Sequence, residues 1–327
     1  MTLGHRLGRE QTAYSTRTSA HRQRTIPTHR HQVSSTLCFE SLRNIAVMIR
    51  SRNNPQVRTI RRLRNAHARR RIDLLLLEGP HLVEAGAEAG LEFHHLLVTP
   101  EFGTAHVELI RRLEDRSGTA ATPIDPDRLL EQADTDAPQG IAALVDPPPN
   151  WHSAEDETLV LTPGLHLYLD GIQDPGNLGA IARSTEAAGA ASLLLAPGTA
   201  RPSQPRALRA SAGSLLRLPL WTDVSINRIP PGVPLLALTV QRTSKGTPPP
   251  TKLLFSIDDS EHRLLAELIS TDAILAVGSE SKGLSGLVLD RAEALLSIPT
   301  APAVESLNAA VAASLALFEL QRLRHTK

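Results

Sequence analysis

The chain has few aromatic residues and almost no cysteine. Phe, Trp and Tyr make up 3% of its 327 residues, and Cys38 is the single cysteine. A core built from this sequence must be aliphatic, and a protein that stacks nucleobases on several aromatic platforms is disfavoured. One cysteine excludes an intramolecular disulfide framework and favours a reducing compartment such as the cytoplasm.

Membrane and metal signals are also lacking. No apolar run reaches the about 18 residues that a membrane-spanning helix needs. The N-terminus lacks the apolar segment of a secretory signal. The 13 histidines include the pairs His29/His31 and His94/His95, but no His-x-x-x-His or Cys-x-x-Cys accompanies them. We therefore expect neither a membrane anchor nor a metal site.

Charge is distributed unevenly along the chain. Residues 1–78 contain 16 Arg, no Lys and 4 acidic residues, which gives them a net charge of +12. The whole chain has a net charge of +1, so residues 79–327 have a net charge of −11. A basic N-terminal segment followed by an acidic remainder predicts a polyanionic partner that binds the N-terminal segment first.

Residues 1–47 are rich in Arg, His, Ser and Thr and have no hydrophobic periodicity. We expect this tail to be disordered or extended. It is an RNA-binding arm, an organelle transit peptide, or an extension upstream of a true start at Met48. The third interpretation is favoured, because the recognisable part of the chain begins directly after Met48.

The first ordered element is expected to be a basic helix beginning at Asn53-Asn54-Pro55, with Asn54 as its cap. Its apolar stripe is Val57, Ile60, Leu63 and Ala66. Nine arginines and no acid fall between residues 50 and 71. Such a run is either a solvated face or, as we predict, an RNA-binding surface, because like charges repel unless a partner neutralises them. The arginines that lie off the stripe are Arg58, Arg61, Arg62, Arg69 and Arg70.

Alternating elements predict two α/β domains. The first spans residues 48–146, with strands at 74–77, 94–98 and 141–145. Residues 147–163 form a Pro-rich, acidic linker. The second spans 164–327 and has a parallel sheet, whose ligands bind at the carboxyl ends of the strands. Its strands are expected at 165–169, 192–196, 235–240, 273–277 and 295–298, and its helices at 177–189, 260–270, 287–293 and 305–323.

The last helix carries the clearest periodic pattern. Leu307, Val311, Leu315 and Phe318 recur at spacings of 4, 4 and 3 and predict a buried stripe, with Ser306 at the N-cap. Alone, this pattern is typical of a capped core helix.

Three motifs follow predicted strands. They are Asn177 to Arg183, Gly278 to Leu284, and Ile298-Pro299 with Ser306-Leu307-Asn308. The second motif also matches the G-x-x-x-x-G of a P-loop, but it lacks the Lys-Ser/Thr that must follow. It also contains the S-x-x-K of penicillin-binding proteins, but the companion S-D-N and K-T-G elements are missing. In this order, the three resemble the N-x-G-x-x-x-R, G-S-E-x-x-G-L and I-P-x-x-x-x-x-S-L-N motifs of the SpoU (TrmH) RNA ribose 2′-O-methyltransferases. The resemblance covers about residues 49–324.

The resemblance implies an L30e-like substrate-binding domain, a trefoil-knotted (SPOUT) catalytic domain and a homodimer. Arg183 acts either as a base or as an electrostatic anchor. Gly278 admits the cofactor S-adenosylmethionine to the backbone, and Glu280 orders its loop or orients an arginine. Residues 205–213 resemble a further segment of the family, with Arg206 in place of a lysine. The implied catalytic residues are Arg183, Asn177, Glu280, Ser306 and Asn308; the cofactor-binding residues are Gly278, Ile298, Pro299, Leu307 and Thr239; Arg206 and Arg209 are further RNA contacts.

The sequence therefore predicts a cytoplasmic, S-adenosylmethionine-dependent RNA 2′-O-methyltransferase that acts on ribosomal RNA. A transfer RNA methyltransferase and a non-catalytic RNA-binding factor on the same fold remain alternatives. An ordinary dinucleotide-binding oxidoreductase is disfavoured because no G-x-G-x-x-G follows residues 165–169. The RNA and the modified nucleotide stay open.

Overall fold

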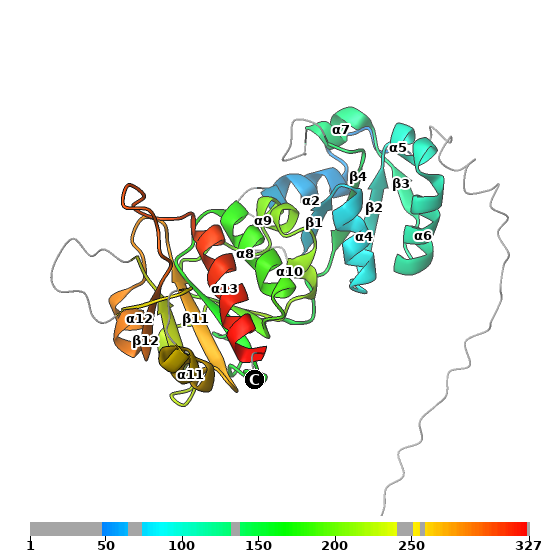
Figure 1. Ribbon diagram of the computed structural model, residues 1–327. Coiled ribbons are helices and arrows are strands. Elements are labelled where there is room, and N and C mark those ends of the chain that lie inside the picture. Colours follow the sequence, from blue (N-terminus) through cyan, green and yellow to red (C-terminus); the bar gives the residue numbers. More distant parts are fainter. Residues whose placement is uncertain (1–47, 65–73, 132–137, 241–250, 256–258, 326–327) are drawn as a thin grey trace, which may run out of the picture. The chain divides into compact units, whose positions relative to one another are not determined.

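The computed structural model describes residues 48–64, 74–131, 138–240, 251–255 and 259–325 (Figure 1). The predicted tail at 1–47 and the predicted RNA contacts Arg69 and Arg70 lie outside these ranges. The described strands form two sheets, a four-stranded one in the order β1-β4-β2-β3 and an eight-stranded one in the order β10-β12-β9-β11-β6-β7-β8-β5.

The four-stranded sheet contains the first three predicted strands and one more. β4 (Ile141–Val145) is central, buried along its whole length, and antiparallel to β1 (Leu75–Glu78) and β2 (Phe93–Val98). β3 (Ala121–Pro123) joins β2 in parallel. Because side chains alternate along each strand, both faces of this sheet are apolar and both are covered by helices.

The basic helix α2 (Pro55–Arg64) covers one face together with α7 (Pro126–Leu130). Val57, Ile60 and Leu63 are buried in this layer, as predicted. Asn54 caps α2, since its Oδ1 accepts a hydrogen bond from the backbone N–H of Gln56 at 2.9 Å. The opposite face carries α4 (Pro80–Glu88) and α6 (Val107–Ser117), and α5 (Pro100–Ala105) follows β2.

Every pairing in the eight-stranded sheet is parallel, so the predicted sheet type is confirmed. One strand falls inside the predicted linker at 147–163: β5 pairs with β8 at the edge of the sheet. The strands are β5 (Trp151–Ser153), β6 (Leu165–Asp170), β7 (Ser192–Leu195), β8 (Leu220–Thr222), β9 (Leu235–Leu238), β10 (Thr251–Leu253), β11 (Ala273–Gly278) and β12 (Ala294–Ser297).

Helices cover both faces of this sheet. Leu167 and Leu169 of β6 face the layer that contains α8 and α13, whereas Tyr168 between them faces the layer of η1 and α12. Figure 1 shows α13 running beside α8, and Ser314 Oγ of α13 lies 2.6 Å from Ser184 Oγ of α8. The first layer consists of α8 (Pro175–Ala187), α9 (Pro205–Ala210), α10 (Ser214–Arg217), α11 (Asp259–Leu268) and α13 (Ala309–His325); the second consists of η1 (Ile226–Arg228) and α12 (Gly286–Arg291).

Two details of the last helix were predicted wrongly. α13 begins at Ala309, and Asn308 rather than Ser306 caps it, because Asn308 Oδ1 accepts from Ala310 N at 2.9 Å and from Val311 N at 3.3 Å. The apolar stripe is exposed, with Val311 at 49%, Leu315 at 41% and Phe318 at 52%. The buried face is instead Ala309, Ala310, Ala313, Ala316, Leu317, Leu320 and Leu323.

The physical reason in the first half of the helix is side-chain size. Four alanines let the first half of α13 approach α8 and the sheet closely, whereas Leu317, Leu320 and Leu323 are the buried residues of its second half. None of the described helices is long and apolar enough to cross a membrane.

Candidate active site

The three motifs meet at the carboxyl edge of the eight-stranded sheet. β6 ends at Asp170 and is flanked by β11, which ends at Gly278. The backbone N–H of Ser285, beyond the second motif, donates to Asp170 Oδ2 at 2.6 Å. The strand order therefore brings together segments that lie more than 100 residues apart in the sequence.

Asn177 is the junction of the three motifs. Its side-chain Nδ2 donates to Glu280 Oε1 of the second motif. Its Oδ1 accepts from Asn308 Nδ2 of the third motif at 3.1 Å. Both ends of one amide are therefore occupied, and the structure joins three of the five predicted catalytic residues directly.

Helix caps fix the orientation of this junction. α8 begins at Pro175, two residues earlier than predicted, and Asp174 caps it by accepting from the backbone N–H of Asn177 at 2.8 Å. Asn308 uses its oxygen for the first turn of α13, so only its NH₂ group is available to Asn177. Sequence reasoning missed Asp174, although Asp followed by Pro is a recognised sign of a helix start.

Residues of the second motif contact one another and stabilise the loop that they form. A Cβ on Gly278 would lie 2.2 Å from the backbone carbon of Gly283, so glycine is required by the close approach of the loop to itself. Ser279 and Gly283 close the turn through two backbone hydrogen bonds of 2.9 and 3.2 Å. Glu280 accepts from Asn177, and no described arginine forms an ion pair with it. The approach of a cofactor to Gly278 stays a prediction.

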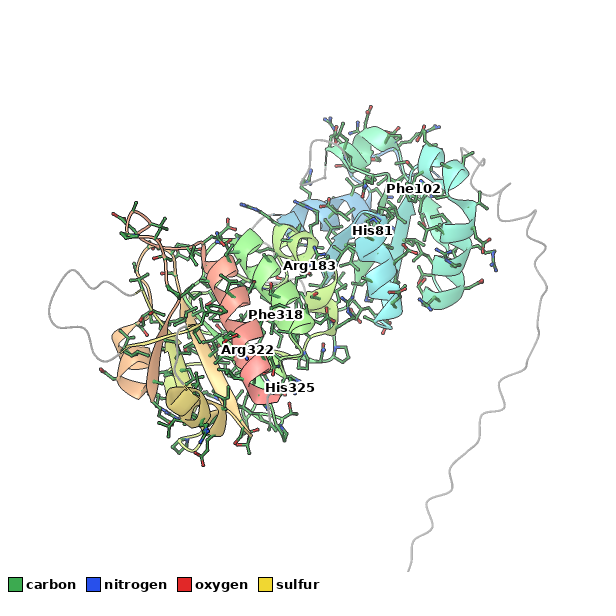
Figure 2. The ribbon with its side chains drawn as sticks, in the orientation of Figure 1. His81, Phe102, Arg183, Phe318, Arg322 and His325 are labelled. Carbon is green, nitrogen blue, oxygen red and sulfur yellow. The ribbon has the colours of Figure 1, made fainter. Side chains whose placement is uncertain are left out.

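Arg183 and Ser306 are not bonded to this junction. Arg183 lies six residues beyond Asn177 on α8, about 9 Å further along the helix axis. It is exposed, as predicted, and forms no ion pair with the described residues (Figure 2). Ser306 is exposed in the segment before α13. An exposed cation without a carboxylate partner among the described residues suits a ligand that carries phosphate.

The predicted cofactor residues follow the strands on the far side of β11. Thr239 follows β9, with its N–H donating to Leu296 O at 2.8 Å, and Ile298 follows β12. Thr239, Ile298 and Leu307 are partly buried and Pro299 is exposed. The fully buried Ser297 Oγ has no partner among the described residues. An unpaired hydroxyl beside apolar side chains fits a ligand with both an aromatic ring and polar groups, as S-adenosylmethionine has.

The predicted RNA-binding arginines fall into two groups. Arg206 and Arg209 are paired within the chain, with Arg206 Nη1 at 3.2 Å from Asp174 and Arg209 Nη1 at 2.9 Å from Glu78. On α2, by contrast, Arg58, Arg61 and Arg62 are exposed and make no ion pair with any described residue. The α2 face is therefore the stronger candidate for a polyanion.

One cluster of polar donors lies away from this site. Glu92, His94 and Asp146 each place one potential ligand atom within 4.8 Å of the others, at the ends of β2 and β4. His94 Nε2 is 2.7 Å from Asp146 Oδ1. Glu92 and His94 are exposed, so the hydrogen bond between His94 and Asp146 accounts for the cluster, and the expected lack of a metal stays a prediction.

Comparisons with known proteins agree with the geometry. Residues 164–318 match the family described as the SpoU rRNA Methylase family, and residues 54–143 match the MRM3-like substrate binding domain. A protein of Synechocystis sp. described as an uncharacterized tRNA/rRNA methyltransferase is 32% identical over 274 residues, which are 84% of this chain and 93% of that protein.

Solved structures of similar architecture extend over most of the chain. The SpoU methyltransferase AviRb of Streptomyces viridochromogenes, in complex with the cofactor AdoMet, is 26% identical with a TM-score of 0.67, covering 84% of this chain and 99% of its own. A solved RNA 2′-O ribose methyltransferase is 27% identical with a TM-score of 0.65, covering 85% and 99%. Both similarities cover more than four fifths of this chain.

Proposed function

The chain belongs to the SpoU family of S-adenosylmethionine-dependent tRNA/rRNA methyltransferases, and from this premise we propose that it methylates a ribose 2′-OH in structured ribosomal RNA. The single observation that carries the proposal is the junction at Asn177, which ties Glu280 and Asn308 to the helix that bears Arg183. A binding protein that had lost catalysis would have no need to keep this set of polar residues.

S-adenosylmethionine supplies an activated methyl group, so the protein contributes mainly by positioning the ribose. We assign its binding to Gly278, Ile298 and Leu307, with Pro299 and Thr239 at the margin. The backbone groups at these strand ends suit an adenosine, and the unpaired Ser297 Oγ offers it a further hydrogen bond.

Arg183 is assigned to the phosphate beside the target ribose and to the oxyanion that develops as the 2′-OH loses its proton. A guanidinium stays protonated under all ordinary conditions, so this residue is an anchor rather than a base. Asn177 and Asn308 hold the loop of Glu280 and the start of α13 in register, and the exposed Ser306, two residues before Asn308, is assigned to the ribose. The role of each residue follows from its place and chemistry.

We assign the first contact with RNA to α2. Arg58, Arg61 and Arg62 lie on a solvent face of this helix and make no ion pair with the described residues, and phosphate groups would neutralise their mutual repulsion. Transfer RNA is the second candidate substrate, and the relative from Synechocystis sp. carries both RNA classes in its description. A cytoplasmic location is part of the same proposal.

The exposed stripe of α13 supports a homodimer. Val311, Leu315 and Phe318 present adjacent apolar side chains to solvent, and Arg322 and His325 continue the helix beyond them (Figure 2). A second copy of the same helix would bury this stripe, because a two-fold interface is self-complementary.

Two measurements test the function. Calorimetry with S-adenosylmethionine should show binding at about micromolar affinity, near −8 kcal/mol. Mapping of ribose methylation in cells with and without the gene should reveal one or a few ribosomal RNA positions that lose the mark. Binding of NAD with no heat from S-adenosylmethionine would contradict the proposal, and so would identical methylation maps.

A further inference from the structure

The carboxyl edge of the eight-stranded sheet has two halves, one on each side of β6. On one side, β11, β9 and β12 end at the second and third motifs. On the other side, β7, β8 and β5 end at a cavity of about 580 Å³. No residue of the three motifs lines this cavity, so the functions assigned above leave it without a role.

The lining of the cavity is rich in polar groups and includes one cation. Arg201, Ser203 and Thr199 come from the loop after β7, Thr222 and Asp223 from the end of β8, and His152 from β5. Arg201 is exposed and makes no ion pair with the described residues. Asp223 is a carboxylate on the same wall, so the cavity offers both a cation and an anion to a ligand.

His152 is held in a fixed orientation. Its ring stacks on Trp221, with centroids 4.6 Å apart and planes inclined by 28°. Its Nδ1 lies 3.0 Å from Glu157 Oε2, and the His152 side chain is 32% exposed. An imidazole anchored on two sides keeps little rotamer freedom, so binding a ligand there costs little further side-chain entropy.

The wall of the cavity is tied to the active-site edge of the sheet. Thr199 Oγ1 accepts from Gly171 N at 3.2 Å and donates to Leu169 O at 3.0 Å, and Ala200 N donates to Ile172 O at 2.7 Å. These bonds fix the loop after β7 to the segment that leads into α8. Because neighbouring strands are about 4.8 Å apart, the end of β8 lies about 10 Å from the end of β6.

We propose that this cavity binds a nucleotide of the RNA substrate that flanks the methylated one, with Arg201 at its phosphate and His152 and Asp223 at its base. Arginine is well suited to phosphate. Proteins read single-stranded RNA by hydrogen bonds to the edges of unstacked bases, and an imidazole and a carboxylate supply such bonds. The inference rests on the proposed function, since it assumes that RNA reaches the Asn177 junction.

Two variants test the cavity in different ways. Arg201→Glu reverses the charge in the cavity. Ser203→Trp places a large side chain at a partly exposed position of the cavity wall and so fills the cavity. Arg263→Glu is the matched control, because Arg263 is an exposed arginine on α11, away from the cavity. The probes are unmodified ribosomal RNA fragments transcribed in vitro, with RNA affinity measured by fluorescence anisotropy, S-adenosylmethionine affinity by calorimetry, and kcat and KM by methyl transfer.

Both cavity variants should weaken RNA affinity and raise KM by about tenfold or more, with cofactor affinity unchanged, whereas the control should match the wild type. RNA carrying a photo-crosslinking nucleoside next to the methylated position should label residues 196–203. Wild-type RNA affinity in both cavity variants would overturn the inference. Binding of free adenosine or guanosine monophosphate without any change in RNA affinity would also overturn it, in favour of a small-molecule site. Wild-type protein that binds RNA through the cavity but transfers no methyl group would instead overturn the proposed function.

Discussion

Asn308 Nδ2 donates a hydrogen bond to Asn177 Oδ1 across 3.1 Å, although 131 residues separate the two in the sequence. The same Asn177 side chain makes a second hydrogen bond, in which its Nδ2 donates to Glu280 Oε1. A single side-chain amide thus holds the loop of Glu280, the first turn of α8 and the start of α13 in one arrangement. The proposed reaction depends on that arrangement, because positioning supplies much of the rate of methyl transfer.

Replacing Asn177 by Asp should be severe for activity and mild for the fold. The new carboxylate cannot donate to Glu280 and places a second negative charge beside it. Loss of one preorganised donor at a reacting centre costs about 3 kcal/mol, or about a hundredfold in rate. Single-turnover methyl transfer, with circular dichroism as the check on folding, measures the effect.

Glu280→Gln provides the matched comparison for Asn177→Asp. The glutamine keeps an oxygen that can accept from Asn177 Nδ2, so its loss of rate should be smaller than that of Asn177→Asp. Equal losses in the two variants would mean that the charge of Glu280, rather than the amide junction, is what the reaction needs.

Arg183 should be dispensable for folding and essential for turnover. Its side chain is exposed and makes no ion pair with the described residues, so Arg183→Ala removes little packing. The variant should bind S-adenosylmethionine normally and methylate RNA about a hundredfold more slowly. Arg263→Ala, at an exposed arginine of α11, should react at the wild-type rate.

Arg183→Lys separates an anchor from a base. A lysine retains the charge but loses the forked geometry, so an anchor is rescued in part. A proton acceptor would give a new pH dependence, because a desolvated lysine titrates where arginine does not. Rates against pH decide, and near-normal turnover by Arg183→Ala would remove the residue from the mechanism.

Much of the fold could be predicted because its signals are local. Buried strands such as residues 141–145 are continuous apolar runs, and Asn54-Pro55 marks the start of α2. The three motifs could be placed at strand ends for the same reason. Short elements such as β3, β5 and β8 have only three residues each, too few to show any period.

The orientation of α13 could not be predicted, because both of its faces are apolar. The stripe of Val311, Leu315 and Phe318 is exposed, and the buried face consists of four alanines, which permit a close approach, and three leucines. Hydrogen bonds between segments that are distant in the sequence could not be predicted either. Nothing in the sequence indicated that Asn177 would accept from Asn308, or that Arg206 and Arg209 would pair with Asp174 and Glu78.

The basic face of α2 should govern RNA affinity. Reversing Arg58, Arg61 and Arg62 to Glu should weaken RNA binding and flatten its dependence on salt, because each lost phosphate contact removes about one unit of slope. Cofactor affinity should be unchanged. The control reverses the α6 arginines Arg111, Arg112 and Arg116, each of which lies within 3.6 Å of an acidic side chain. Equal effects of the two triple variants would show that net charge alone matters.

The stripe of α13 should hold two copies of the chain together. Leu315→Glu places a charge in the middle of the stripe and should convert a dimer into a monomer, as measured by analytical ultracentrifugation. Leu264→Glu is the control, since Leu264 is an apolar residue of α11 that is 60% exposed. A wild-type monomer, or a Leu315→Glu dimer, would assign the stripe to another partner.

His166 should make the fold sensitive to mild acid. Burial lowers the pKa of this histidine below its ordinary value of 6.5, with Arg324 lowering it further and Asp272 and a hydrogen bond at Thr162 opposing the shift. Its Nδ1 is 2.8 Å from Ser192 Oγ. The unfolded chain therefore binds a proton that the folded chain does not, and the free energy of unfolding falls as pH drops below 6.5.

His166→Asn removes the titration while keeping a polar group near Ser192. The slope of unfolding free energy against pH between about 7 and 5 should fall by at most about 1.4 kcal/mol per pH unit, which is the contribution of one proton. Urea denaturation at several pH values measures it. An unchanged slope in His166→Asn would mean that this histidine takes up no proton on unfolding.

The central claim is that the methyl group goes to a ribose 2′-oxygen. The direct measurement is nucleoside mass spectrometry of unmodified ribosomal RNA after incubation with the purified protein and methyl-labelled S-adenosylmethionine. The account predicts label in a 2′-O-methylnucleoside, in a linkage that resists alkaline hydrolysis, with Arg183→Ala and Asn177→Asp both strongly reduced. Label on a nucleobase, or equal labelling by the wild type and both variants, would contradict it.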